Sequence, residues 1–166
     1  MDHKTSLTQH IKAPADRVWA VVSDIPGSAA TLSAIDSVQM LTAGPYAEGT
    51  RWKETRTMMG RSETVELWVA QCEPPSAGRD GGARGGTTGG STTVKARQAG
   101  ADYTSRFALA ERDGGTDLTL TFGAEVIKPT RLSRIMMAVF GPIGMRITRK
   151  ALARDLAEIA AKAESL

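Results

Sequence analysis

The chain has 166 residues, of which 41% are hydrophobic and 23% charged, and its net charge is +3. This length suits a single domain over residues 1–166 with a hydrophobic core, and no apolar run approaches the roughly 18 residues of a membrane span. Cys72 is the only cysteine, which excludes an internal disulfide and a cysteine metal cluster.

The N-terminal segment lacks the apolar region of a secretory signal, so we expect a cytoplasmic protein. Its two histidines, His3 and His10, would lie on opposite faces of a strand and would not converge on one metal ion. We therefore predict no metal site and no cofactor. Cys72 ends an apolar strand-like run, which favours a buried structural thiol over a nucleophile.

Much of the basic excess lies late in the chain, at Lys128, Arg131, Arg134, Arg146, Arg149, Lys150 and Arg154. A nucleic-acid surface usually adds aromatic platforms or a recognised motif to such charge. Neither occurs here, so we expect no nucleic-acid partner. The simplest interpretation is the solvated face of a C-terminal helix. A transient contact with a membrane surface, without stable insertion, is the alternative.

The N-terminal quarter predicts one strand followed by two short helices. Leu7–Lys12 has a strand pattern, and Pro14 suits the first turn of a helix whose positive end Asp16 complements. A break at residues 25–27 separates this helix from a second short one over Ser28–Ser33. The two helices form a connector rather than a hairpin.

Six further segments are predicted as strands because apolar and β-branched residues alternate between turn residues. They are Ser37–Leu41, Gly49–Met58, Ser62–Cys72, Thr92–Gln98, Tyr103–Ala110 and Thr116–Val126. In the last of them the apolar residues share one face and the polar residues the other, which is typical of a sheet with one buried face. Short connections, such as the Asp113–Gly114–Gly115 turn, favour an antiparallel meander.

The segment Ser76–Ser91 reads SAGRDGGARGGTTGGS and predicts a flexible hairpin loop. Its glycine content is too high for a stable helix or strand. A phosphate-binding loop is not supported, because no Gly-Lys-Ser/Thr sequence and no following helix occur. A lid over a ligand is the alternative.

A long amphipathic helix is predicted after Pro129, with an interruption at Gly141–Gly144 and an end near Ser165. Beyond the interruption one apolar stripe contains Met145, Leu152, Leu156, Ile159 and Ala163. Residues 135–140 are apolar all round, which indicates either a cavity mouth or a dimer contact. We therefore expect a monomer or a homodimer.

Together these elements predict an α+β fold in which a curved seven-stranded antiparallel sheet wraps around a long C-terminal helix. Two short helices follow the first strand. The space enclosed between such a sheet and helix is where small apolar ligands bind.

The chain resembles the START-like, birch-pollen-allergen-like helix-grip superfamily, also called SRPBCC, in its polyketide cyclase/dehydrase and lipid-transport branch. The resemblance rests on IKAPADRVWAVVSD at 11–24, GTRWKETR at 49–56, CEPP at 72–75 and GGTDLTLTFGAEV at 114–126. It implies a deep, largely apolar cavity between sheet and helix. It does not imply one activity, since members include aromatase/cyclases, lipid carriers, hormone receptors and quinone-binding proteins.

The chain departs from the superfamily pattern in two places. The glycine-rich segment is longer than the usual tight turn, and GSAATLSA at 27–34 replaces a common tryptophan–proline cluster.

The third predicted strand supplies the polar half of a candidate site. If Trp52 faces inward, the period of two sends Glu54 and Arg56 inward as well. This pair could orient the polar end of a ligand, such as a carboxylate or a phenol, and a buried carboxylate could act as a general base. The alternative is that Trp52 packs at one end of the sheet and the charges reach solvent.

The sixth predicted strand places Tyr103, Ser105 and Phe107 on one face, and Phe107 indicates that this face is the inner one. A tyrosine hydroxyl could polarise a ligand carbonyl, although a buried tyrosine bonded to the backbone is the commoner arrangement. We expect Met136, Val139 and Phe140 to close the same cavity.

Two functional hypotheses follow. The first is a binding or carrier module that sequesters a small hydrophobic molecule of lipid, polyketide or aromatic type. The second is a polyketide cyclase or aromatase that uses acid–base groups in the same cavity. An interaction or regulatory protein with an incidental cavity is a third alternative. No residue is assigned as catalytic.

Overall fold

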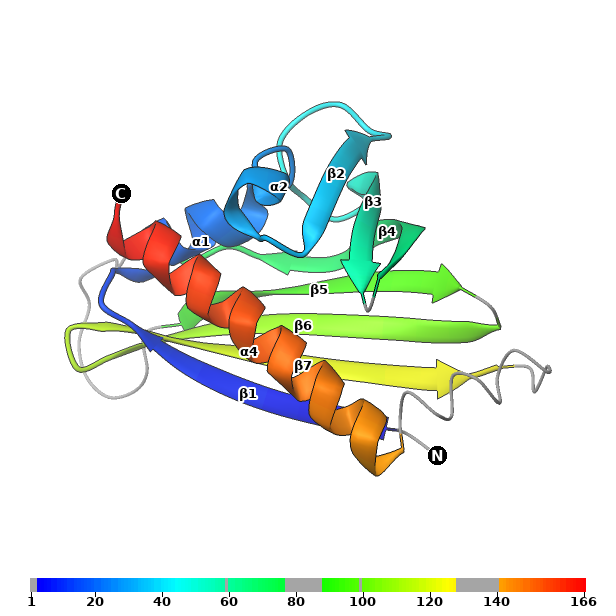
Figure 1. Cartoon of the computed structure of the whole chain (residues 1–166). Helices are drawn as coiled ribbons and strands as arrows, with labels where there is room; N and C mark the ends of the chain where they lie inside the picture. The colour runs from blue at the N-terminus through cyan, green and yellow to red at the C-terminus, as the bar shows by residue number, and fades with distance from the viewer. Residues whose placement is uncertain (1–2, 59, 77–87, 99, 128–140) are drawn as a thin grey trace.

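An antiparallel sheet carries one long helix diagonally across one face in the computed structural model (Figure 1). The structure describes residues 3–58, 60–76, 88–98, 100–127 and 141–166. The elements in chain order are β1 (His3–Ile11), α1 (Ala15–Ser23), α2 (Ser28–Thr31), β2 (Ile35–Met40), β3 (Arg51–Met58), β4 (Arg61–Glu73), β5 (Thr88–Gln98), β6 (Ala101–Arg112), β7 (Gly115–Val126) and α4 (Pro142–Glu164).

The seven strands follow the spatial order β1-β7-β6-β5-β4-β3-β2, and every neighbouring pair is antiparallel. β1 pairs with the last strand, so it forms one edge of the sheet while β2 forms the other. The α1–α2 connector therefore carries the chain from one edge to the opposite edge, and β2 to β7 then return as a meander.

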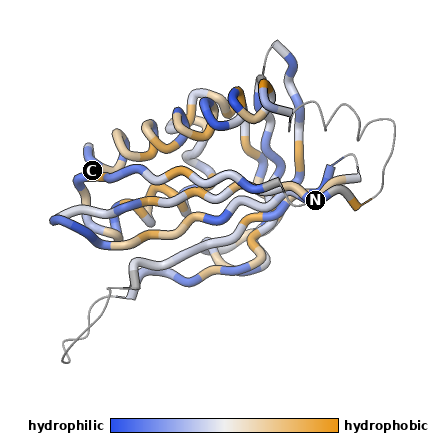
Figure 2. Tube along the Cα trace, turned by 90° about the horizontal axis from the view of Figure 1, so that it is seen from below, coloured by the Kyte–Doolittle hydropathy of each residue, from blue (hydrophilic) through white to orange (hydrophobic). Residues whose placement is uncertain are grey.

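α4 forms a second layer over the sheet, as the view from below shows (Figure 2). It packs mainly against β1 and α1, and its backbone approaches the strands β3 to β6 much less closely. Two glutamates fasten its C-terminal half: Glu158 accepts hydrogen bonds from the Ser33 amide and hydroxyl, and Glu164 accepts one from the Lys12 amide. Nearer its N-terminal end, which lies over β1 (Figure 1), Arg149 donates a hydrogen bond of 2.6 Å to the Thr5 hydroxyl.

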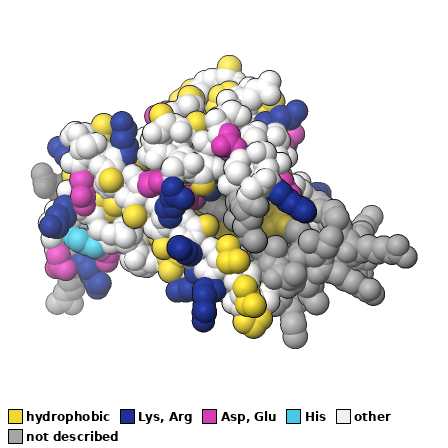
Figure 3. Space-filling view, viewed as in Figure 1, with side chains coloured by type: hydrophobic (Ala, Val, Ile, Leu, Met, Phe, Trp, Pro, Cys, Tyr) yellow, Lys and Arg dark blue, Asp and Glu magenta, His cyan; other side chains and the backbone are white. Residues whose placement is uncertain are grey.

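The outer surface of α4 is basic. Arg146, Arg149, Lys150 and Arg154 are exposed, and Figure 3 shows dark blue side chains along the helix with hydrophobic ones at its N-terminal end. For these four residues the predicted solvated face is confirmed. Among the described residues, no helix combines the length and hydrophobicity that a membrane crossing requires.

The β6–β7 hairpin is closed by the turn that the sequence predicts. Arg112 pairs with Gly115, which leaves two turn residues, Asp113 and Gly114, with φ of 50° and 74°. Positive φ at both positions is the type I′ geometry that matches the twist of paired strands. Next to the turn, the Thr116 hydroxyl is buried and donates a hydrogen bond of 2.8 Å to the Ala13 carbonyl.

The hydrophobic interior is divided into two clusters. The larger lies beneath α1 and the C-terminal half of α4, and its buried members are Ile11, Ala13, Ala15, Val18, Leu109, Leu118, Leu120, Leu156, Ile159, Ala160 and Ala163. The smaller lies between the α1–α2 connection and the strands β3, β4 and β5, and its buried members are Ile25, Trp52, Val69 and Val94. The helix therefore seals one part of the sheet and not the whole inner face.

The predicted α+β fold is confirmed, including the two short helices after the first strand and a helix end close to Ser165. At the predicted interruption, Gly141 has an extended backbone and Pro142 occupies the first turn of α4. Gly144, however, lies inside the helix and does not interrupt it. The helix predicted between Pro129 and Phe140 lies outside the described residues.

The predicted loop Ser76–Ser91 is too long, because Thr88–Ser91 belong to β5. The register between β5 and β6 shifts between Thr88 and Ser91, which is a β-bulge. Glycine is required there: a Cβ on Gly89 would lie 2.1 Å from the Leu109 carbonyl oxygen. The glycines at this bulge thus allow two strands to approach closely. Residues 77–87 lie outside the described part of the chain.

We predict that Leu156→Ala lowers the free energy of unfolding by about 3 kcal/mol, because a fully buried leucine is removed from the larger cluster. Urea unfolding followed by circular dichroism measures the change. Ile143→Ala is the control, since Ile143 lies on the same helix but is 77% exposed and should cost less than about 0.5 kcal/mol. Equal losses in the two variants would contradict the assigned core.

Candidate functional site

The inward face of β3 carries Trp52, Glu54 and Arg56, as strand parity predicts. Trp52 and Glu54 are buried, with Glu54 only 9% exposed, whereas Arg51 and Lys53 on the other face are exposed. The Arg56 side chain is 32% exposed. The alternative in which these charges reach bulk solvent is therefore wrong for Glu54 and holds only partly for Arg56.

Arg56 is the centre of a charged cluster that joins β3 to α4. Its Nε donates to Glu54 Oε1 at 2.5 Å, and its Nη1 donates to Asp155 Oδ2 at 2.8 Å. The Trp52 indole Nε1 donates to the second oxygen of Glu54 at 3.3 Å. Both carboxylate oxygens of Glu54 thus accept hydrogen bonds. Asp155, which is 7% exposed, accepts the bond from Arg56 through one oxygen.

The cluster shifts the pKa values of its members in ways that follow from burial and charge. Burial favours the neutral form of Arg56, but the Glu54 and Asp155 carboxylates outweigh it and raise the pKa of the guanidinium further above its ordinary range. Burial raises the pKa of Asp155 above its ordinary value of 3.8, and the Arg56 guanidinium only partly opposes this shift. Folded Asp155 therefore holds its proton more tightly than a solvated aspartate does.

Sequence reasoning missed Asp155, although a signal for it exists. Asp155 follows Leu152 by three positions and precedes Ile159 by four, so it lies on the apolar stripe of α4. A carboxylate on a stripe that packs against a sheet needs a buried partner. Arg56, predicted to face inward on β3, is that partner.

The second predicted group lies on β6. Tyr103, Ser105 and Phe107 share a face with the buried Ala101 and Leu109, which confirms that this face is the inner one. All three are half-buried rather than fully buried. Their face is therefore not fully sealed by the protein.

Tyr103 is held by an aromatic neighbour. Its ring stacks on Phe122 of β7, with a centroid distance of 6.1 Å and an interplanar angle of 25°. Burial, and secondarily the charge of Glu63, raises the pKa of Tyr103, so its hydroxyl stays protonated at neutral pH. A protonated hydroxyl with a raised pKa is a poor general base.

The sheet register relates the two predicted groups. Trp52 pairs with Leu67, Leu67 with Ala96, and Ala96 with Tyr103, so Trp52 and Tyr103 lie in one row across four strands. On a flat sheet this row separates them by roughly 14 Å, since strands lie about 4.8 Å apart. They share a face, and a ligand lying across the strands could reach both. Met136, Val139 and Phe140, predicted to close the site, lie outside the described residues.

Trp19 and Tyr46 form an aromatic pair that the sequence did not predict. Their rings meet edge to face, with centroids 6.1 Å apart. The Thr92 hydroxyl donates to the Gln71 carbonyl, so it accepts the hydrogen bond of 2.7 Å from the Tyr46 hydroxyl. Tyr46 belongs to the β2–β3 connection, where sequence periodicity gives no signal. Burial raises the pKa of Tyr46 to about 12, so this hydroxyl is structural.

The single cysteine, Cys72, offers no activated thiol. Cys72 is half-buried, and burial raises the pKa of its thiol, which disfavours the thiolate. Within the described parts of the chain, no group of three or more histidine, cysteine, aspartate or glutamate residues could hold a metal ion.

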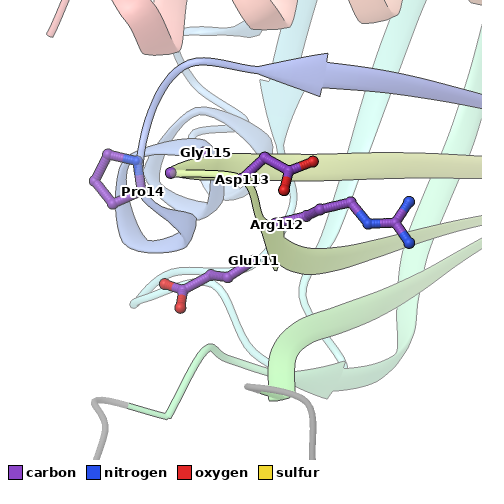
Figure 4. A pocket seen from close by; sticks show the side chains of 6 residues that line it. Pro14, Glu111, Arg112, Asp113 and Gly115 are labelled. Atoms are coloured by element: carbon purple, nitrogen blue, oxygen red, sulfur yellow. The ribbon is translucent and has the colours of Figure 1, made fainter.

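A hollow of about 380 Å³ lies elsewhere, at the tip of the β6–β7 hairpin beside the start of α1 (Figure 4). It is lined by Pro14, Glu111, Arg112, Asp113, Gly114 and Gly115. Figure 4 shows the charged side chains of Glu111 and Arg112 pointing in opposite directions. A shallow hollow without converging side chains is a weaker candidate than the buried cluster around Arg56.

We predict that Arg56→Gln lowers the free energy of unfolding by about 3 kcal/mol or more, because it leaves two buried carboxylates without their cation. Arg51→Gln is the matched control on the same strand: Arg51 pairs with Glu66 on the exposed face and should cost at most about 1 kcal/mol. Chemical denaturation at neutral pH measures both. Similar costs would show that the buried cluster does not support the fold.

The raised pKa of Asp155 predicts how stability depends on pH. Folded Asp155 holds its proton more tightly than the unfolded chain does, so its contribution is fully present below about pH 3.8 and is lost as the pH rises through the folded pKa. The free energy of unfolding of the wild type, minus that of Asp155→Asn, should therefore fall over this window. Denaturant titrations of both proteins from pH 3 upward measure the difference. A constant or rising difference would exclude the shift.

Solved structures share this fold over nearly the whole chain. The Zhui aromatase/cyclase from Streptomyces sp. R1128 has a TM-score of 0.73 at 16% identity and covers 99% of this chain and 94% of its own. A START superfamily protein from Mycobacterium smegmatis has a TM-score of 0.70 at 15% identity, with 98% of each chain covered. Ara h 8.0201 has a TM-score of 0.67 at 14% identity, with 100% of each chain covered. At these identities the similarity shows the fold alone.

No curated protein sequence matches the chain significantly. A family model described as "Polyketide cyclase / dehydrase and lipid transport" matches residues 2–164. Since this match spans almost every residue, the chain belongs to the polyketide cyclase/dehydrase and lipid transport family.

Proposed function

We propose that the protein binds a small hydrophobic molecule between its sheet and α4, as a carrier or sequestering module. The observation that carries this proposal is the buried cluster of Glu54, Arg56 and Asp155, which stands on the inner face between two separate apolar clusters. A protein that needed only a stable core would fill this position more cheaply with apolar side chains. A polar anchor within apolar surroundings is the arrangement that orients a bound ligand.

The packing of α4 supports the same proposal. The helix packs on β1 and α1 and approaches the middle strands less closely. The side chains in the middle of the inner face of β6 are only half-buried. Phe107, Tyr103 and Phe122 form an aromatic surface on the inner face of β6 and β7, which offers a contact area for the hydrocarbon part of a ligand. The family, whose description joins lipid transport with polyketide chemistry, handles molecules of this kind.

A second candidate function is a cyclase or aromatase acting on a polyketide or aromatic ketone. The observation that favours it is Asp155, a buried carboxyl with a raised pKa beside a guanidinium, which suits a general acid or base. A catalyst needs a convergent acid and base, whereas a carrier needs one anchor. Conversion of an aromatic ketone by the wild type, and its loss in Asp155→Asn with binding retained, would favour the enzyme.

Other expectations from the sequence stay predictions. These are the cytoplasmic location, the monomeric or homodimeric state, a transient membrane contact, and the single-domain organisation of residues 1–166. An interaction or regulatory protein with an incidental cavity is the remaining alternative.

The proposal is tested by native mass spectrometry of the purified protein and by titration with N-phenyl-1-naphthylamine, a neutral probe that fluoresces in apolar surroundings. We predict a co-purified small molecule or saturable probe binding. Ser105→Phe should weaken probe binding at least about tenfold, because the new ring fills the inner face next to Phe122.

Thr104→Phe is the matched control. Thr104 is the neighbouring residue on β6 and, by strand parity, lies on the outer face, so the same ring should leave probe binding unchanged. Absence of both a bound molecule and saturable probe binding in the wild type would overturn the proposed function. Equal effects of the two phenylalanines would move the site away from the inner face.

A further inference from the structure

We propose that the polar end of the ligand is an un-ionised hydroxyl, as in a phenol or an alcohol, and that the site disfavours carboxylates. This inference rests on the proposed function and specifies the chemistry of the same site. It starts from an oxygen of the charged cluster for which the described residues provide no hydrogen-bond partner.

Asp155 Oδ1 is that oxygen. It is buried, and in the described part of the protein it has no hydrogen-bond partner, although Oδ2 of the same carboxylate accepts from Arg56. A buried acceptor without a donor costs about 1–3 kcal/mol, and more when it carries charge. A ligand that places a hydrogen-bond donor there recovers this energy.

Arg56 sets the second requirement. Its Nε and Nη1 already donate to the two carboxylates, a guanidinium has three N–H groups beyond these two bonds, and the side chain remains 32% exposed. Because Oδ1 belongs to the carboxylate that Arg56 holds, this acceptor and the further guanidinium donors are neighbours. A hydroxyl satisfies both, since it donates to Oδ1 and accepts from the guanidinium.

Other polar groups fit the cluster less well: a carboxylate or an ammonium because of its charge, and an ether or a ketone because it has no proton to donate. With all three groups ionised, two carboxylates face one guanidinium, so the cluster has one excess negative charge. A ligand carboxylate would accept from Arg56 but would stand against Asp155 without a proton to donate. An ammonium would donate to Asp155 but would meet the Arg56 cation. An ether or a ketone would leave Oδ1 unpaired.

Displacement of N-phenyl-1-naphthylamine at neutral pH tests the inference with two matched series. The aromatic series is 2-naphthol, 2-naphthoate and 2-methoxynaphthalene, and the aliphatic series is dodecan-1-ol and dodecanoate. We expect each hydroxyl compound to bind at least about tenfold more tightly than the carboxylate of its series. 2-Naphthol should also bind more tightly than its methyl ether.

Asp155→Asn sharpens the test. The amide can still accept from Arg56 through its oxygen, but it presents a donor where Oδ1 was and removes the excess negative charge. The hydroxyl compounds should therefore lose affinity and the carboxylates gain it, which narrows or reverses the preference. Asp113→Asn is the control: it removes one carboxylate at the exposed hairpin turn, where asparagine tolerates positive φ, and should leave the preference unchanged.

The outcomes separate this inference from the proposed function. Carboxylates that bind as tightly as the hydroxyl compounds in both series, or an ether equal to 2-naphthol, would overturn the inference while ligand binding stands. The second result would indicate that Asp155 is protonated and donates. Wild-type protein that binds neither the reporter nor any of the five compounds would overturn both. The wild-type series decides the question even if Asp155→Asn folds poorly.

Discussion

The two ion pairs of Arg56 tie the helix layer to the far half of the sheet. α4 packs on β1 and α1 and donates a hydrogen bond from Arg149 to Thr5 of β1, but its link to β3 is the Arg56 guanidinium, which reaches Asp155. Without this link, the smaller hydrophobic cluster on β3, β4 and β5 would have no described polar tie to α4. The cluster also favours a single pairing register of β3 with its neighbouring strands. A slip of one residue in β3 would turn Arg56 outward and leave Asp155 buried and unpaired.

A buried charged group is a costly way to join two layers. Apolar residues of similar volume usually stabilise a core at least as well, since both charges must lose their water. Here the cost is partly offset by the hydrogen bonds that Trp52 and Arg56 donate to Glu54, but one Asp155 oxygen has no hydrogen-bond partner among the described residues. Stability therefore does not account for the arrangement, which is the reason for proposing that the cluster recognises a ligand. Sites that bind ligands retain such local imbalances because the ligand corrects them.

Sequence reasoning placed residues correctly where the two-residue period of a strand decides on which face a side chain lies. The alternation along β3 and β6 was enough to place Glu54, Arg56 and Ser105 on the inner face, because a strand allows only two faces. It failed where the determinant was tertiary. Asp155 was overlooked as one polar residue within an apolar stripe, and Tyr46 stands in a connection without periodicity. The extra strand length at Thr88–Ser91 depends on a bulge and on close backbone contact with Leu109, and composition does not reveal either.

The position of the site follows from a gradient of packing along α4. Its C-terminal half is anchored, with Leu156, Ile159 and Ala163 buried and Glu158 and Glu164 bonded to the chain segments beside it. In its N-terminal half, Thr148 is the buried residue and Ile143 and Ile147 are exposed. Asp155 stands where the sealed half ends, next to Leu156. A polar group at this boundary is shielded enough to bind strongly, yet it adjoins the part of the sheet that the helix does not seal, and so it can meet a ligand that enters there.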